Sequence, residues 1–156
     1  MTSATVITDA SFCSETRAAG WAAYIRIDGV PEPVKAYAAF REPLINSAEA
    51  ELLAAVNGLW LARQHGAEHL LLQTDCLAVV HLINRKYRGR RWKLHRVLVA
   101  AFADKGLDLV AVTARHVKGH SGVKDARSYV NRWCDRHAKA AMRGHRKQLV
   151  SLETEA

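Results

Sequence analysis

The chain has 156 residues, 49% of them hydrophobic and 24% charged, which is typical of one soluble domain with a full core. Its net charge of +8 favours a polyanionic partner, most often nucleic acid. The longest apolar run, 97–103, is too short to span a bilayer, and the three cysteines fit neither a disulfide framework nor a zinc site. We therefore expect a cytoplasmic monomer with no membrane partner.

Three strands linked by short turns open the predicted fold. Residues 4–9 form an apolar strand, residues 20–27 alternate in hydrophobicity, and residues 34–40 form a third strand. Asp28 and Gly29 are a hairpin turn signal between the second and third strands. These strands predict an antiparallel meander.

A helix is predicted next, because the hydrophobic period changes. Asn46 and Ser47 are typical N-cap residues, and Gly66 is typical of a helix C-terminus. One side of the helix carries mostly small residues, along which it could lie close to a sheet. That stripe contains Glu51, Ala55, Gly58 and Ala62.

Strands and helices alternate in the rest of the chain. We expect a strand over 68–75, helices over 77–84 and up to Gly106, a strand over 107–117 and a last helix over 131–143. The polar residues 144–156 indicate a flexible C-terminal tail. This order predicts an α/β fold with a five-stranded mixed sheet, three antiparallel strands coming before the alternation. Helices would cover both faces of the sheet, and residues 1–143 would form a single domain.

Two aspartates stand at the ends of buried strands, Asp9 in TVITDAS and Asp75 in LLLQTDC. If these strands are parallel neighbours, the two side chains meet at the edge of the sheet where α/β folds bind ligands. Glu51 and Asp135, each early in a predicted helix, complete a set of four carboxylates. Each is ordinary alone, since aspartates form turns and acidic residues favour helix N-termini. The hypothesis of a site therefore depends on all four converging.

Four converging carboxylates would repel one another, so some would be protonated unless a cation is bound. Oxygen ligands suit Mg²⁺ or Mn²⁺ rather than zinc. Two such ions about 4 Å apart can hold the attacking and leaving oxygens of a phosphodiester. Together with the basic charge of the chain, such a site indicates a nucleic-acid backbone as the substrate.

The motifs TDAS, AELLAAVNGL, LLLQTDC and VKGHSG…NRWCDRHAKAA occur in this order over residues 6–142. In sequence and spacing the set resembles type 1 ribonuclease H. The resemblance implies the RNase H-like fold and an endonuclease that hydrolyses the RNA strand of RNA–DNA hybrids, leaving 5′-phosphates. It also implies two Mg²⁺ ions, for which Mn²⁺ can substitute. The implied metal ligands and catalytic residues are Asp9, Glu51, Asp75 and Asp135.

The resemblance extends to residues beyond these carboxylates. His120, in KGHSG, matches a mobile-loop histidine thought to assist proton transfer or product release. Asn131 matches an asparagine near the scissile phosphate, and Ser11 of TDAS is an expected substrate contact. The loop over 121–130 is longer than is usual in the family. His116 and His137 have no comparable context and are left out.

A basic segment over residues 84–96 contains seven Lys or Arg residues and no acidic residue. It stands where the family has a basic substrate-binding protrusion, and aromatic residues between its charges could stack on nucleic acid. The expected substrate contacts are Arg85, Lys86, Arg88, Arg90, Arg91, Trp92 and Lys93. The alternative interpretation of this segment is a solvated basic surface with no substrate contact.

Three alternatives to a ribonuclease H are compatible with parts of the sequence. Leu77 stands where the family often has a glutamine that helps to read the RNA 2′-hydroxyl, so a junction resolvase-like DNA nuclease is one alternative. A non-catalytic nucleic-acid-binding module is another, although all four carboxylates are present. The third is a metal-dependent phosphatase acting on small molecules, but such an enzyme would not need so many Lys and Arg residues around its site.

Overall fold

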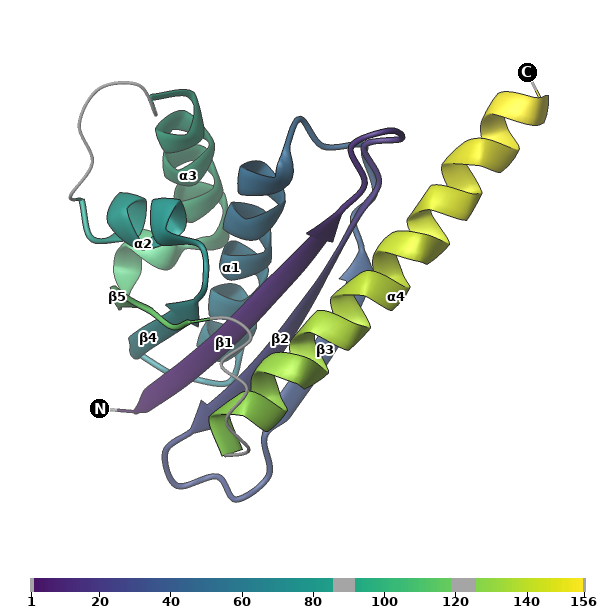
Figure 1. Ribbon diagram of the computed structural model, residues 1–156. Helices are drawn as coiled ribbons and strands as arrows, with labels where there is room; N and C mark the ends of the chain where they lie inside the picture. The colour runs from purple at the N-terminus through teal and green to yellow at the C-terminus, as the bar shows by residue number, and fades with distance from the viewer. Residues whose placement is uncertain (1, 86–91, 119–125, 156) are drawn as a thin grey trace.

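The computed structural model describes residues 2–85, 92–118 and 126–155. Within these ranges five strands, four α-helices and one short 3-10 helix follow one another along the chain (Figure 1). In order they are β1 (Ser3–Phe12), β2 (Ala19–Ile27), β3 (Val34–Ala39), α1 (Ser47–Gln64), β4 (His69–Thr74), α2 (Leu77–Ile83), α3 (Trp92–Lys105), η1 (Leu107–Leu109), β5 (Ala111–His116) and α4 (Ala126–Glu155).

The strands form one mixed sheet in the order β3-β2-β1-β4-β5. The β1, β2 and β3 strands pair antiparallel, as the meander predicted, whereas β4 pairs parallel with both β1 and β5. The predicted five-stranded mixed sheet is therefore confirmed. The strands that carry Asp9 and precede Asp75 are parallel neighbours in its centre.

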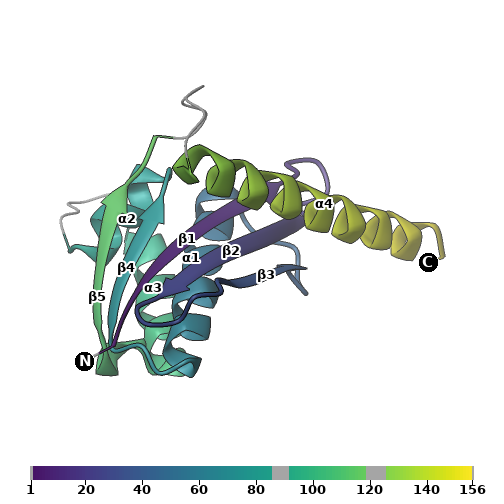
Figure 2. The same ribbon diagram turned by 90° about the horizontal axis from the view of Figure 1, so that it is seen from below.

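Helices cover both faces of this sheet (Figure 2). The α1 helix packs on β1 and β2 with α3 behind it, and α4 crosses β1, β2 and β3 on the opposite face. Because side chains alternate along a strand, β1 serves two cores. Val6 lies in the core with Leu52 of α1, whereas Ile7 lies in a smaller core with Trp133 of α4.

The small-residue stripe of α1 lets this helix approach the sheet closely, as predicted. Gly58 is the closest point, since a Cβ atom there would lie 2.6 Å from Thr8 Cγ2 and 2.8 Å from Val6 Cγ1. The ends of α1 follow local signals as well. The Asn46 side chain accepts a hydrogen bond from the Glu49 N–H, and Gly66 has a positive φ of 89° just after the helix.

The final helix differs most from the sequence prediction. It begins at Ala126 rather than near Asn131, so residues 126–130 of the expected loop 121–130 are helical. It also continues to Glu155, where a flexible tail was predicted from Gly144 onward. Just beyond Gly144 a tertiary contact holds the helix, because the buried His145 ring, 2% exposed, accepts a hydrogen bond from the Ala19 N–H at Nδ1 (3.1 Å).

Smaller differences concern element ends. The strand expected over 68–75 ends at Thr74, and Asp75 lies just beyond it. The strand expected from residue 107 begins at Ala111, because residues 107–109 form the 3-10 turn η1. Gly106, in a left-handed conformation with φ 67°, separates that turn from α3. No helix in the described part of the chain combines the length and apolarity needed to cross a membrane.

Candidate active site

Three carboxylates meet where β1 and β4 approach their carboxyl ends. Asp9 projects from β1, Asp75 follows the last residue of β4, and Glu51 comes from the second turn of α1. One carboxylate oxygen of each lies within 4.8 Å of the others. The parallel pairing of β1 and β4 accounts for the approach of Asp9 and Asp75. Glu51 reaches them because α1 lies so close to the sheet.

One backbone amide orients two of these side chains. The Ala10 N–H donates to Asp9 Oδ1 at 3.0 Å and also to Glu51 Oε1 at 3.3 Å. The other Glu51 oxygen, Oε2, is buried and has no hydrogen-bond partner among the described residues. A buried polar atom without a partner costs about 1–3 kcal/mol, so this oxygen is a ready ligand for a cation.

The electrostatics of the cluster are strained in the absence of a cation. Burial, followed by the charges of Asp75 and Asp135, raises the pKa of Asp9 to about 7. Burial, followed by the charges of Asp9 and Asp75, raises the pKa of Glu51 to about 9. Near neutral pH the two carboxyls therefore hold protons that ordinary carboxyls would have released.

These observations fit a hard divalent cation. The donor set consists of carboxylate oxygens, which Mg²⁺ and Mn²⁺ prefer. The cluster is compact, one of its buried oxygens lacks a partner, and two of its members have raised pKa values. A bound cation would relieve both the missing hydrogen bond and the mutual repulsion.

Asp135 lies beside this cluster rather than within it. Its side chain is 30% exposed and forms an ion pair with Lys139, at 3.0 Å from Oδ2 to Nζ. Its charge nevertheless contributes to the raised pKa of Asp9, so the two carboxyls are close enough to interact. Since α4 begins at Ala126, Asp135 lies beyond the first turn, and the helix macrodipole does not explain its position.

His116, for which the sequence predicts no role, contacts the site. It is the last residue of β5, and its Nε2 lies 3.1 Å from the backbone carbonyl oxygen of Asp75, to which it can donate a hydrogen bond. What reveals this contact is the register of β4 and β5, which sequence patterns do not give. In the parallel register Thr74 pairs with His116, so the ends of β4 and β5 place His116 next to Asp75.

The other predicted contacts are only partly described. Ser11 lies in β1, two positions beyond Asp9, and Asn131 is half-buried in α4. Lys93 is exposed in the first turn of α3, and Trp92 is the first residue of that helix. The remaining predicted contacts His120, Lys86, Arg88, Arg90 and Arg91 lie outside the described residues.

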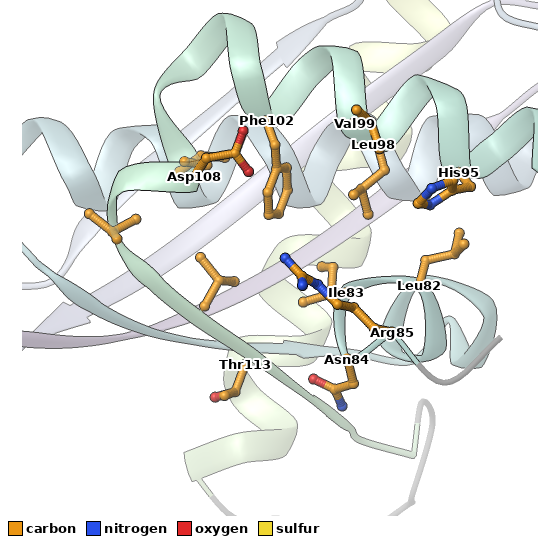
Figure 3. Close-up of a pocket in the computed structure, with 13 residues that line it drawn as sticks. Leu82, Ile83, Asn84, Arg85, His95, Leu98, Val99, Phe102, Asp108 and Thr113 are labelled. Carbon is orange, nitrogen blue, oxygen red and sulfur yellow. The ribbon is translucent and has the colours of Figure 1, made fainter.

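Arg85, the last of the predicted basic contacts, lines a separate cavity of about 810 Å³ between α2, α3 and β5. Figure 3 shows Arg85 and Asn84 at one side of this cavity and Leu98, Val99 and Phe102 of α3 opposite them. The Asn84 side chain bonds to the backbone N–H and C=O of Ala114, which fixes the end of α2 against β5. None of the three clustered carboxylates lines this cavity.

Comparison with solved structures identifies the class of fold. The N-terminal RNase H domain of a Mycobacterium tuberculosis protein aligns with a TM-score of 0.74 and 17% identity, over 95% of this chain and 99% of that domain. RNase H1 from Halobacterium salinarum aligns with a TM-score of 0.70 and 16% identity, over 91% and 98%. LC11-RNase H1 in complex with an RNA/DNA hybrid aligns with a TM-score of 0.69 and 15% identity, over 90% of this chain and 97% of that chain. The chain therefore has the RNase H-like fold that its motifs implied.

The sequence itself identifies the family. Residues 7–103 match the model of the reverse transcriptase-like family, and the chain belongs to that family. The match includes Asp9, Glu51 and Asp75. A search of curated proteins finds no match. The chain is therefore a member of the reverse transcriptase-like family with an RNase H-like fold.

Proposed function

We propose that this protein is a metal-dependent endoribonuclease that hydrolyses the RNA strand of RNA–DNA hybrids and leaves 5′-phosphates. The observation that carries the proposal is the meeting of the Asp9, Glu51 and Asp75 carboxylates at the ends of parallel strands. The fold, the family and the net charge of +8 support a nucleic-acid substrate. A structural neighbour, LC11-RNase H1, has been solved with an RNA/DNA hybrid, which favours a hybrid over other nucleic acids.

In this proposal Asp9, Glu51, Asp75 and Asp135 hold two Mg²⁺ ions, for which Mn²⁺ can substitute. When bound, such ions supply Lewis acidity at the phosphate and lower the pKa of a bound water. The protein's own part is to hold the ligands in place. Asp9 is fixed in a central strand, the Ala10 N–H orients Asp9 and Glu51, and His116 holds the backbone at Asp75. Since Asp9 and Glu51 have raised pKa values, metal binding would release protons.

Further roles in the proposal rest on the motifs. His120 would assist proton transfer or product release, and Asn131 and Ser11 would contact the substrate near the scissile phosphate. The basic residues of segment 84–96 would bind phosphates, which makes affinity decrease as salt increases. Replacing Arg90, Arg91 and Lys93 together by alanine should weaken binding and flatten its salt dependence.

A panel of substrates tests the proposed reaction. The protein is incubated with a labelled RNA–DNA hybrid, double-stranded RNA, single strands and a four-way DNA junction, each with Mg²⁺, with Mn²⁺ or with EDTA. We expect cleavage of the hybrid alone, in the RNA strand, and none in EDTA. Cleavage of the junction but not of the hybrid would show a DNA nuclease. Binding without cleavage would show a module that has kept the fold but not the activity.

A further inference from the structure

A group of aromatic rings lies on the α4 side of β3, away from the carboxylate cluster. The His137 ring lies beside two others and is tilted against both, with its centroid 4.4 Å from that of Tyr37 and 4.3 Å from that of Trp133. Trp133 is 8% exposed and packs edge-on against Tyr24 in the smaller core. Tyr37 is 54% exposed, so one ring of the group is open to solvent on a rigid support.

Basic side chains lie around these rings. Lys35 Nζ lies 5.7 Å from the centroid of Tyr24 and 5.9 Å from that of Trp133. On α4, Tyr129, Arg132 and Arg136 follow one another at helical spacing and are all exposed. With Trp133 and Asp135 they line a hollow of about 330 Å³. Among the residues that the structure describes, Asp135 is the only acidic one lining that hollow, and Lys139 pairs with its charge.

The position of Tyr37 relative to the carboxylates follows from the sheet register. Asp9 pairs with Ala22, and Ala22 pairs with Tyr37, so the three residues form one row across β1, β2 and β3. Paired residues of neighbouring strands point to the same face of the sheet, and strands lie about 4.8 Å apart, so Tyr37 is about 10 Å from Asp9. Asp135 lines the hollow, so the surface continues from the candidate metal site along α4.

We propose that this surface, made of Lys35, Tyr37, Tyr129, Arg132, Trp133 and Arg136, binds an unpaired nucleic-acid strand that extends from the duplex held at the carboxylates. Tyr37 would stack on a base, and Arg132 and Arg136 would contact phosphates. The placement of the duplex rests on the function proposed above. The surface itself rests on an exposed, supported ring with cations around it, which is how proteins bind single strands without reading sequence. Bases inside a duplex are already stacked, so an exposed tyrosine favours an unpaired extension.

A purely structural role for these residues is the competing explanation. Trp133 and Tyr24 do belong to the smaller core, and their burial needs no ligand. Tyr37, Tyr129, Arg132 and Arg136 are different, because they are exposed and lie outside the buried cluster, where the Tyr37 ring contacts Trp133 only edge-on, at 6.2 Å between centroids. Replacing them should therefore leave the fold intact, and a loss of strand binding would report the surface alone.

The test measures binding by fluorescence anisotropy in EDTA, which prevents metal-dependent cleavage. The probes are a blunt RNA–DNA hybrid and the same hybrid carrying a single-stranded extension on each of its four ends in turn. We expect the wild-type protein to bind at least one extended hybrid more tightly than the blunt one. Tyr37→Leu should weaken binding of the extended hybrid about fivefold or more and leave binding of the blunt hybrid unchanged. Tyr37→Phe should bind the extended hybrid as tightly as the wild type does.

Charge is tested separately, with a matched control. Arg132→Gln/Arg136→Gln should reduce the preference for the extension, whereas Arg143→Gln/Lys147→Gln, which removes the same charge farther along α4, should not. If every extended hybrid binds like the blunt one, or if Tyr37→Leu and the Arg132/Arg136 variant keep the preference, the proposal is overturned. A protein that prefers extensions but cleaves no hybrid would retain this surface and lose the proposed nuclease function, so the two failures are distinguishable.

Discussion

Glu51 is the residue on which the geometry of the site depends most. One of its oxygens shares the Ala10 N–H with Asp9, the other has no partner among the described residues, and the pKa of the group is raised to about 9. A carboxyl in this state is protonated near neutral pH when no cation is present. The charged carboxylate of Glu51 is therefore the favoured form near neutral pH only when a cation is bound.

This gives a prediction for Glu51→Gln. The amide resembles the protonated carboxyl in shape and charge but takes up no proton on folding, so in EDTA at neutral pH the free energy of unfolding should be higher than that of the wild type. Stabilisation by Mg²⁺ should be lost, because a ligand is missing. Thermal unfolding with and without Mg²⁺ measures both effects.

Glu49→Gln is the matched control, since Glu49 lies on the same helix but is bonded to the Ile45 N–H outside the cluster. It should keep the Mg²⁺ response of the wild type. An equal loss of that response in both variants would contradict a specific role for Glu51.

At the residue level, the sequence predicted which carboxylates form the cluster better than it predicted the contacts around them. Asp9 and Asp75 were predictable because each comes after an apolar run, Asp9 within β1 and Asp75 just beyond β4, and parallel strands bring such positions to one edge of the sheet. The contact of His116 with the Asp75 carbonyl depends on the register of β4 and β5, which sequence patterns do not give. The contacts of the His137 ring with Tyr37 and Trp133 likewise depend on how α4 crosses β3.

Among the elements, α1 and α4 differ in what fixes their ends. Asn46 and Gly66 are local signals, and the observed ends of α1 agree with them. The polar end of α4 carries no such signal, and its helical state depends on packing of the distant strand β2 against the His145 ring. A prediction from local sequence therefore placed the end of α1 correctly and stopped α4 too early.

Two glycine substitutions test the helix packing in opposite directions. Gly58→Ala should destabilise the protein by about 1–3 kcal/mol, because its Cβ would overlap Thr8 and Val6. Gly144→Ala, in α4 with nothing within 4 Å of the added Cβ, should stabilise it by about 0.5–1 kcal/mol. Urea unfolding of both variants measures the difference. Equal effects would contradict the close approach of α1 to the sheet.

Truncation tests the C-terminal part of α4. A chain that ends at Arg143 lacks the buried His145 ring and its bond to Ala19, and should lose about 2 kcal/mol or more of stability. A chain that ends at Leu149 keeps that contact and should be close to the wild type. If both truncations are equally stable, residues beyond Arg143 are dispensable and the domain ends there, as the sequence indicated.

For the whole molecule, the raised pKa values predict how stability depends on pH in EDTA. Asp9 and Glu51 have ordinary pKa values of 3.8 and 4.5, but about 7 and about 9 in the fold. Above the ordinary values the unfolded chain has released protons that the folded protein keeps. The free energy of unfolding should therefore fall as pH rises from about 4 to about 9, by an amount on the order of a few kcal/mol.

Magnesium should reverse this loss, because the cation replaces the protons. At a concentration one hundred times its Kd, Mg²⁺ adds about 2.7 kcal/mol to the stability. Unfolding curves across this pH range, with EDTA or Mg²⁺, check the prediction. The double variant Asp9→Asn/Glu51→Gln should lose most of the pH slope, and an unchanged slope would mean that other groups cause it.

The most direct measurement of the central claim compares cleavage of one labelled RNA–DNA hybrid in Mg²⁺ by the wild type, by Asp75→Asn and by Asp108→Asn. Asp75 supplies an oxygen to the carboxylate cluster, whereas Asp108 lies in the η1 turn before β5, outside it. We predict that the wild type and Asp108→Asn cut the RNA strand at similar rates and that Asp75→Asn, folded to the same extent, does not. Full activity of Asp75→Asn would contradict the account.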